Sequence, residues 1–182
     1  YIANNPELSE KLTLRVYTAH LLGSEPTLVL HGGGNTSVKL QQTNLFGEPQ
    51  NALYIKGSGS DLSTLQTHEL VGLELDFLKT LRNLDHLSDE EMENQLQTHK
   101  LKASSPMPSV ETLLHAFLPH TYIDHTHADS ILALTNQKNA AALIHQVLGN
   151  PVAVLPYKRP GFPLAKAVID AYEKNPAVEA II

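Results

Sequence analysis

The segment Leu30-His-Gly-Gly-Gly-Asn-Thr-Ser-Val-Lys39 places a glycine-rich turn directly before a strand pattern. Three consecutive glycines allow the backbone to approach a ligand closely and to point N–H groups at an anion. Asn35 and Ser37 add side-chain donors. Gly-Gly-Asn is also good chemistry for a tight hairpin, so an anion-binding loop and a simple turn both remain open for this segment.

A second glycine-rich segment, Lys56-Gly-Ser58-Gly59-Ser60-Asp61, follows a strand predicted over residues 52–56. Its backbone N–H groups and hydroxyls are suited to close around a phosphate. The alternative is a helix N-terminus in which Ser60 or Asp61 caps a helix that starts at Leu62.

Two histidines, His125 and His127, fall in a strand predicted over residues 122–127. Residues i and i+2 of a strand point to the same face, so both imidazoles can reach one metal ion, and neutral imidazole suits zinc. The alternative is a pair of solvated histidines in a chain that has 10 of them. Asp124 and Asp129 flank the pair, either as acceptors for a ring N–H or as surface carboxylates.

Glu111 follows Pro108-Ser109 in the first turn of a helix that we expect to be capped by Ser109 and to run to Leu118. A carboxylate there is stabilised by the positive end of the helix dipole. It would also be a good proton shuttle if a metal and a phosphate lay nearby. A role confined to the dipole is the alternative.

Elsewhere the hydrophobic periodicity alternates between helix and strand. Leu8, Leu12, Val16 and Ala19 recur at helical spacing and predict a helix over residues 6–22 that stops at Gly23. Further helices are predicted over residues 66–81, 89–99, 128–134, 138–148 and 165–174. Further strands are predicted over residues 27–31, 35–40, 151–156 and 178–182. We expect one α/β domain, a three-layer α/β/α sandwich with a single mixed or partly antiparallel sheet covered by helices on both faces.

Composition narrows the class of protein. The 182 residues are 42% hydrophobic and 18% charged, which fits one ordinary globular domain. The net charge of −6 and the lack of a basic run argue against a nucleic-acid partner. No cysteine, signal peptide or membrane-length apolar stretch is present, so we expect a cytoplasmic protein with no membrane partner. The chain lacks an initial methionine and stops inside an apolar run, so we expect domain 1–182 to be C-terminally incomplete.

In this order, the four segments resemble the class II aldolase/adducin-head family, and the resemblance covers essentially the whole chain. The stretches from Leu30 to Lys39, Pro108 to Phe117 and Asp124 to Asp129 resemble one branch in particular, as does Tyr157-x-x-Pro-Gly161. That branch comprises bifunctional proteins in which an aldolase-like domain precedes a short-chain dehydrogenase domain, including rhamnulose-1-phosphate aldolase types.

The resemblance assigns a role to each matching residue. Glu111 matches the catalytic acid/base, and His125 and His127 match two of three zinc ligands. The third histidine of the family is expected beyond Ile182. Val110 departs from the family, because many members have a second serine there. The phosphate-binding positions are matched by Gly34, Asn35, Ser58, Gly59 and Ser109.

The implied activity is a zinc-dependent lyase that cleaves a ketose 1-phosphate to dihydroxyacetone phosphate and an aldehyde. The alternatives are a pentulose-phosphate 4-epimerase and a non-catalytic, adducin-like oligomerisation head. The family also implies a homo-oligomer, a tetramer by resemblance, and allows a C-terminal dehydrogenase domain in the full polypeptide. Residues 1–182 contain no dinucleotide fingerprint of their own. By themselves they are expected to bind zinc poorly and to be nearly inactive.

Overall fold

The structure is a computed structural model that describes residues 6–182. Its helices are α1 (Pro6–Gly23), α2 (Leu75–Thr80), α3 (Asp89–Thr98), α4 (Thr112–Phe117), α5 (Asp129–Thr135), α6 (Ala140–Leu148) and α7 (Phe162–Lys174), with 3-10 turns η2 (Thr67–Glu69) and η3 (Leu81–Asn83). Its strands are β1 (Asn35–Thr43), β2 (Pro49–Lys56), β3 (Leu70–Glu74), β4 (Tyr122–His125), β5 (Val152–Ala153) and β6 (Ala180–Ile181). None of the helices in this part of the chain is long and apolar enough to span a bilayer.

The central sheet has four strands in the order β3-β2-β1-β4, and every neighbouring pair is antiparallel. The strand predicted over residues 35–40 is confirmed as part of β1, and its side chains alternate between the two faces of the sheet. Val38 and Leu40 pack in the core on the α1 side, whereas Ser37 contacts His115 of α4 on the other side. Because side chains alternate along a strand, β1 serves both faces of the sheet.

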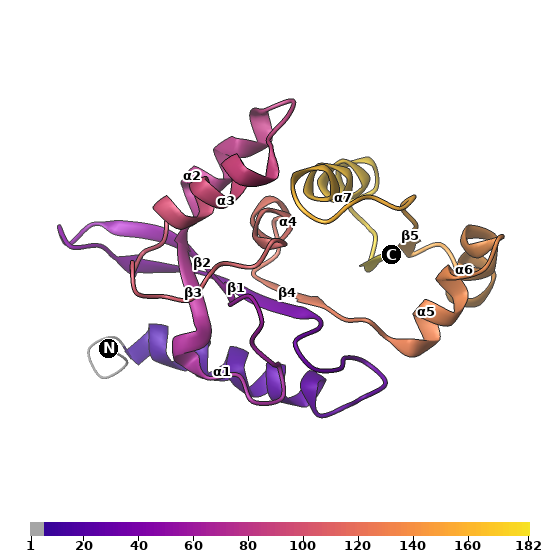
Figure 1. Ribbon diagram of the computed structural model, residues 1–182, viewed down its shortest axis with the longest axis horizontal. Coiled ribbons are helices and arrows are strands. Elements are labelled where there is room, and N and C mark those ends of the chain that lie inside the picture. Colours follow the sequence, from indigo (N-terminus) through magenta and orange to yellow (C-terminus); the bar gives the residue numbers. More distant parts are fainter. Residues whose placement is uncertain (1–5) are drawn as a thin grey trace.

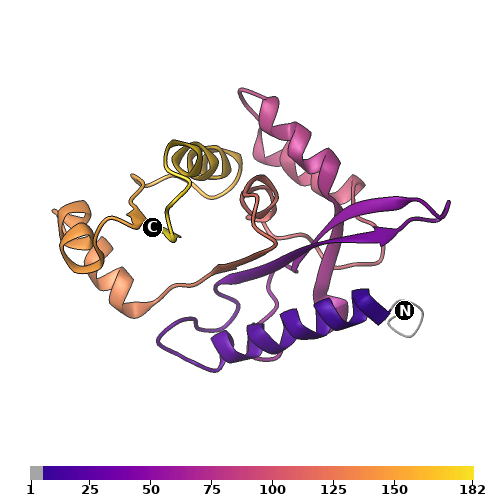
Figure 2. The ribbon, with the colours of Figure 1, turned by 180° about the vertical axis from the view of Figure 1, so that it is seen from behind.

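Helices cover both faces of this sheet (Figures 1 and 2). Helix α1 lies along one face, and α2, α3, α4 and α7 lie on the other. Leu12 and Ala19 bury the inner side of α1, as their spacing predicts, whereas the side chain of Leu8 lies outside the described residues. On the opposite face Leu53 and Ile55 are fully buried beneath the helices. Burial of each such side chain contributes roughly 1.5–3 kcal/mol. The predicted three-layer α/β/α sandwich is confirmed.

A second, smaller sheet corrects the prediction of one sheet. Strands β5 and β6 pair in parallel and do not join the four-stranded sheet. The predicted strands at residues 151–156 and 178–182 are therefore real but shorter. Helices α5 and α6 extend away from the end of β4, beside this small sheet (Figure 1).

Two predicted elements are wrong. Residues 66–81 are not one helix, because residues 70–74 form β3 between η2 and α2. Leu70, Val71 and Leu73 are buried on both sides of the sheet, and such a continuous apolar run fits a buried strand as well as a helix. Residues 27–31 form turns rather than a strand, with the N–H of Leu28 bonded to the carbonyl of Glu25.

The start of β1 depends on Gly34, and this generates a stability test. Gly34 has φ +66°, and a Cβ there would lie 2.7 Å from the carbonyl oxygen of His125 and from Cγ1 of Val29. Gly47 in the β1–β2 turn has φ +82° but nothing within 4 Å of its would-be Cβ. Gly47→Ala should therefore cost only the backbone strain of roughly 1–2 kcal/mol. Gly34→Ala adds a collision with backbone and should cost several times more. Urea unfolding of both variants measures this, and equal losses would contradict the account.

Candidate active site

Three loops meet at one end of the central sheet. A Cβ on Gly32 would lie 3.4 Å from the carbonyl oxygen of Gly59, so the two glycine-rich loops are in contact. The N–H of Ser58 donates to the carbonyl of Met107 at 2.9 Å, which joins the second loop to the segment before α4. Residues 58–59 form a turn and no helix begins at Leu62, so the alternative of a capped helix is not observed. The first loop is not a tight hairpin either, because residues 27–31 form no strand.

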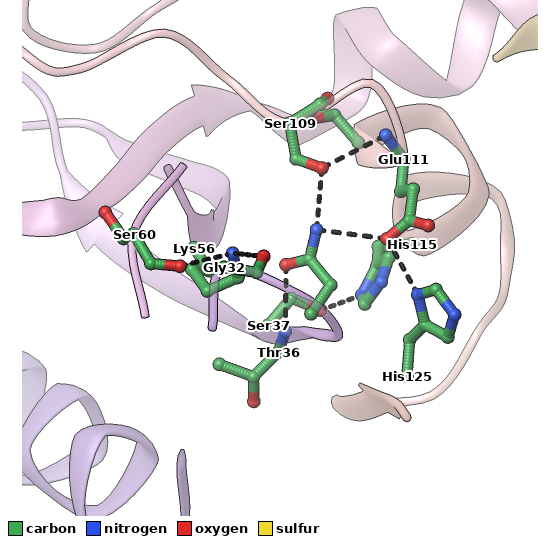
Figure 3. A network of polar contacts seen from close by, with 11 residues as sticks. Gly32, Thr36, Ser37, Lys56, Ser60, Ser109, Glu111, His115 and His125 are labelled. Atoms are coloured by element: carbon green, nitrogen blue, oxygen red, sulfur yellow. Dashed lines mark hydrogen bonds and ion pairs between the residues drawn. The ribbon is translucent and has the colours of Figure 1, made fainter. Parts of the chain in front are cut away.

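Asn35 connects the first loop to the segment before α4, where Ser109 and Glu111 lie close together (Figure 3). Its side-chain amide donates to Ser109 Oγ at 2.6 Å and to Glu111 Oε2 at 3.2 Å. Its Oδ1 accepts the N–H of Thr36 at 2.8 Å, which fixes the orientation of the amide. Asn35 is 2% exposed, so these bonds are shielded from water.

Glu111 lies at the position just before α4, and Ser109 is not the N-cap that we predicted. Glu111 occupies the N-cap site without a side-chain cap bond, and its N–H donates to Ser109 Oγ at 3.2 Å. Burial acts to raise the pKa of the Glu111 carboxyl. The hydrogen bond and electrostatic effect of His125, together with smaller effects of His115 and of the Asn35 amide, outweigh burial and lower that pKa below its usual value. Glu111 is therefore a carboxylate at neutral pH.

The histidine pair lies beside this carboxylate. His125 Nδ1 is 2.9 Å from Glu111 Oε2, and because the carboxylate only accepts, Nδ1 carries the proton. The ring centroids of His125 and His127 are 4.8 Å apart. The strand ends at His125, so the predicted extension of β4 to residue 127 is wrong, although the N–H of His127 still bonds to the carbonyl of Leu28 at 2.8 Å. The two rings remain neighbours.

These two rings fit a divalent metal. With its proton on Nδ1, His125 leaves the Nε2 lone pair available, and a carboxylate on the other ring nitrogen is the usual arrangement around a metal-binding histidine. Burial, followed by the charge of His125, lowers the pKa of His127, which favours the neutral ring that metals require. No group of three or more metal-binding side chains occurs within residues 6–182, and the third ligand beyond Ile182 stays a prediction.

Lys56 was missed as a functional residue by sequence reasoning. It is 3% exposed, and its Nζ donates to the carbonyl of Gly32 at 3.2 Å and to that of Ser60 at 2.7 Å. Burial lowers its pKa, and the nearby charges of Glu111, Asp61 and Glu69 oppose that change. One lysine therefore holds both glycine-rich loops. The available signal was a lysine at the end of the otherwise apolar strand run at residues 52–56.

His115 and Ser37 were also missed. His115 Nδ1 lies 2.7 Å from Ser37 Oγ, and its Nε2 has no hydrogen-bond partner within the described residues. Burial lowers the pKa of His115 to about 3, against a smaller opposing effect from the charge of Glu111. The ring is thus neutral, and it lies behind Glu111 in Figure 3.

The flanking aspartate Asp124 does not contact either histidine. It pairs with the buried Arg15 of α1 at 2.8 Å and accepts from Thr36 Oγ1 at 2.6 Å, on the opposite face of the sheet. This follows from alternation, since His125 is the next residue of the same strand.

The sheet enclosed by helices, with the site at the strand ends, defines the fold as that of the class II aldolases. The structure superposes on the N-terminal class II aldolase domain of a conserved protein from Thermoplasma acidophilum with a TM-score of 0.85 and 41% identity, covering 92% of this chain and 77% of that one. Superposition on a sugar-phosphate aldolase from Thermotoga maritima gives a TM-score of 0.65 at 16% identity, covering 92% and 79% of the two chains.

The chain belongs to the class II aldolase and adducin N-terminal domain family, whose sequence profile matches residues 14–181. Among curated proteins it is 40% identical over 167 residues to YuxG of Bacillus subtilis, named an uncharacterized oxidoreductase. The match covers 92% of this chain but only 24% of the length of YuxG.

The buried His115 predicts how stability depends on pH. The unfolded chain protonates this histidine near pH 6.5, whereas the folded protein resists protonation down to about pH 3. The unfolded state therefore binds more protons between these values, and stability falls as the pH drops. His115→Gln keeps a partner for Ser37 but does not titrate. The difference in free energy of unfolding between wild type and this variant should shrink from pH 7 to pH 4, as measured by urea unfolding.

The exposed His86 supplies the matched control, because His86→Gln also removes one histidine but at the surface. That variant should follow the wild-type pH dependence. Parallel curves for wild type and His115→Gln would show that His115 is protonated freely in the folded protein.

Proposed function

We propose that this domain carries the catalytic site of a zinc-dependent lyase that cleaves a ketose 1-phosphate, of the rhamnulose 1-phosphate type, to dihydroxyacetone phosphate and an aldehyde. The observation that carries the proposal is Glu111, which is ionised and held by Asn35 on one side and His125 on the other. Family membership and the fold support a lyase or epimerase; the substrate and the metal are part of the proposal.

The phosphate of the substrate would bind where the three loops meet. Gly32, Ser58 and Gly59 are exposed there, and the N–H groups of Gly32 and Gly59 donate to no protein acceptor within residues 6–182. Backbone N–H groups of this kind bind anions well. Gly34 and Ser109 are further matched phosphate positions, and the buried cation of Lys56 supports the negative charge. Asn35, the remaining matched position, would act by holding Ser109, because both hydrogens of its amide are already donated to Ser109 and Glu111. Holding the phosphate orients the reacting carbons.

Glu111 would move the proton. When the carbon–carbon bond breaks, its electron pair stays on the dihydroxyacetone phosphate half as an enediolate, and a proton must then be added to carbon. The ionised Glu111 would accept the proton that the substrate hydroxyl loses as the aldehyde forms, and would then deliver that proton to the enediolate carbon; in the reverse direction the carboxylate removes it from carbon. The bond from Asn35 keeps the carboxylate oriented between substrate and histidine.

His125 and His127 would hold the metal together with a third histidine from beyond Ile182. A bound divalent ion supplies Lewis-acid stabilisation of negative charge on substrate oxygens. Glu111 binds the Nδ1 proton of His125, and so it fixes which ring nitrogen faces the ion.

A pentulose-phosphate 4-epimerase is the second candidate, since it needs the same bond cleavage and proton-transfer residues. A non-catalytic adducin-like head is disfavoured, because Glu111, His125 and His127 are present and lie together.

The larger assembly is also proposed. The oxidoreductase name and greater length of YuxG support a polypeptide that continues into a dehydrogenase domain. A homo-oligomer, a tetramer by family resemblance, fits the exposed apolar side chains Leu14, Tyr17 and Leu21 along the outside of α1. The absence of cysteine suits a cytoplasmic location.

The first test is catalysis by the full-length protein with several ketose 1-phosphates and a divalent ion. Wild type should release dihydroxyacetone phosphate, and Glu111→Gln should lower kcat by about 10²–10⁴-fold, since general acid–base catalysis has that magnitude. Asp129→Asn, in the first turn of α5, is a control that should retain activity. Epimeric product without aldehyde would select the epimerase, and inactivity of wild type with all substrates would count against both.

The second test is zinc titration of residues 1–182 beside a polypeptide extended through the next strand. Two histidines supply too few ligands for a catalytic zinc site, which normally has three from the protein. Complete zinc sites are worth on the order of 10–16 kcal/mol, so loss of one ligand should weaken binding by several orders of magnitude. Calorimetry should therefore show weak binding by the shorter piece. Equal, tight, stoichiometric binding by both would mean that the metal site is already complete within residues 1–182.

A further inference from the structure

A cavity of about 520 Å³ lies next to the loop of Ser58. Its wall also includes Val110 and, from the segment before α7, Arg159. The first turns of α3 contribute Asp89 and Glu93. The cavity therefore adjoins the proposed phosphate site at Ser58, and neither Glu111 nor His125 lines it.

Arg159 is the one cation among the described residues that line this cavity. Its Nη2 lies 2.6 Å from Asp89 Oδ2, but the two side chains are 76% and 51% exposed. An exposed ion pair of this kind contributes little to stability, because water screens both charges. Arg159 can thus exchange Asp89 for another anion at small cost.

The backbone keeps Arg159 close to the site. Gly161, two residues later, has φ +114°, and a Cβ on it would lie 3.5 Å from Asp89 Oδ1 and 3.9 Å from Cγ2 of Val110. The segment that contains Arg159 and Gly161 is therefore packed between the start of α3 and Val110. A guanidinium at this place is within the same cavity as Ser58, and its planar donors match a phosphate.

We infer that Arg159 is a phosphate-binding residue of this site, and that Asp89 competes with the ligand for it. The inference rests on the proposed function, because it takes the phosphate to bind at Ser58 and Gly59. Arg159 leaves Asp89 and pairs with the phosphate when a phosphorylated ligand enters. Affinity for the phosphate group, and selectivity for phosphorylated over unphosphorylated sugars, then depend on the balance between Asp89 and the ligand. Glu93 adds a second negative charge to the wall and opposes binding.

The two partners should have opposite effects on phosphate affinity. The experiment is calorimetric titration of the full-length protein with inorganic phosphate, which reads binding without any turnover. Arg159→Gln should raise the Kd about fivefold, since a charged pair is lost at a site where water screens part of its energy. Arg159→Lys should fall between this variant and wild type, because the charge remains but the planar fork is lost. Asp89→Asn should lower the Kd a few-fold by releasing Arg159.

The matched control is Lys158→Gln, which removes the same charge from the neighbouring exposed residue that does not line the cavity. It should leave the Kd within about twofold of wild type, because salt screens the effect of one distant, exposed charge on the phosphate. Ser109→Ala tests the proposed phosphate site independently of Arg159 and should weaken binding.

Four results are decisive. In the first, wild type binds phosphate, Ser109→Ala raises the Kd, and Arg159→Gln has the same Kd as Lys158→Gln. The inference is then overturned while the proposed function survives. If wild type binds no phosphate, both are overturned. An increase in Kd for Arg159→Gln with a decrease for Asp89→Asn supports the competition, and a shift of both variants in the same direction rules it out.

Discussion

The antiparallel pairing of β1 with β4 sets Asn35 directly opposite His125, and the candidate site depends on that register. From this position the Asn35 amide reaches Ser109 and Glu111, and Glu111 reaches back to His125. These four side chains come from three segments that lie far apart in the sequence, and together they form one hydrogen-bonded network. A shift of one residue in this register would turn either Asn35 or His125 to the face of α1.

That opposite face contains the interactions that oppose such a shift. Arg15 of α1 is buried and pairs with Asp124, which also accepts from Thr36. The Thr36–Asp124 pair neighbours the Asn35–His125 pair in the ladder, so an ion pair on one face, buried at Arg15 and exposed at Asp124, holds the alignment of the site on the other. Removing Asp124 would leave the buried guanidinium of Arg15 without a carboxylate partner. Arg15 also donates to the carbonyl of Ser37, so α1 supports the site from the other face of the sheet.

Sequence reasoning found the groups with distinctive chemistry and missed those defined by three-dimensional packing. The glycine-rich loops, Glu111 and the histidine pair were recognised from motif order, and the structure brings them together. The residues over 70–74 were assigned to a helix because a buried strand is apolar on both faces and loses its twofold period. Lys56 and His115 look ordinary in the sequence, since only burial against the glycine loops and behind Glu111 gives them unusual surroundings.

The central claim is that Glu111 transfers a proton to and from the carbon of the substrate. Hydrogen–deuterium exchange tests that step without any aldehyde. The exchange is measured by NMR in D₂O at the hydroxymethyl carbon of dihydroxyacetone phosphate, with the full-length protein and a divalent ion. The account predicts exchange of one of the two hydrogens at that carbon by wild type, and loss of that exchange in Glu111→Gln with dihydroxyacetone phosphate still bound. Undiminished exchange by the variant would contradict the account, because another group would then carry the proton.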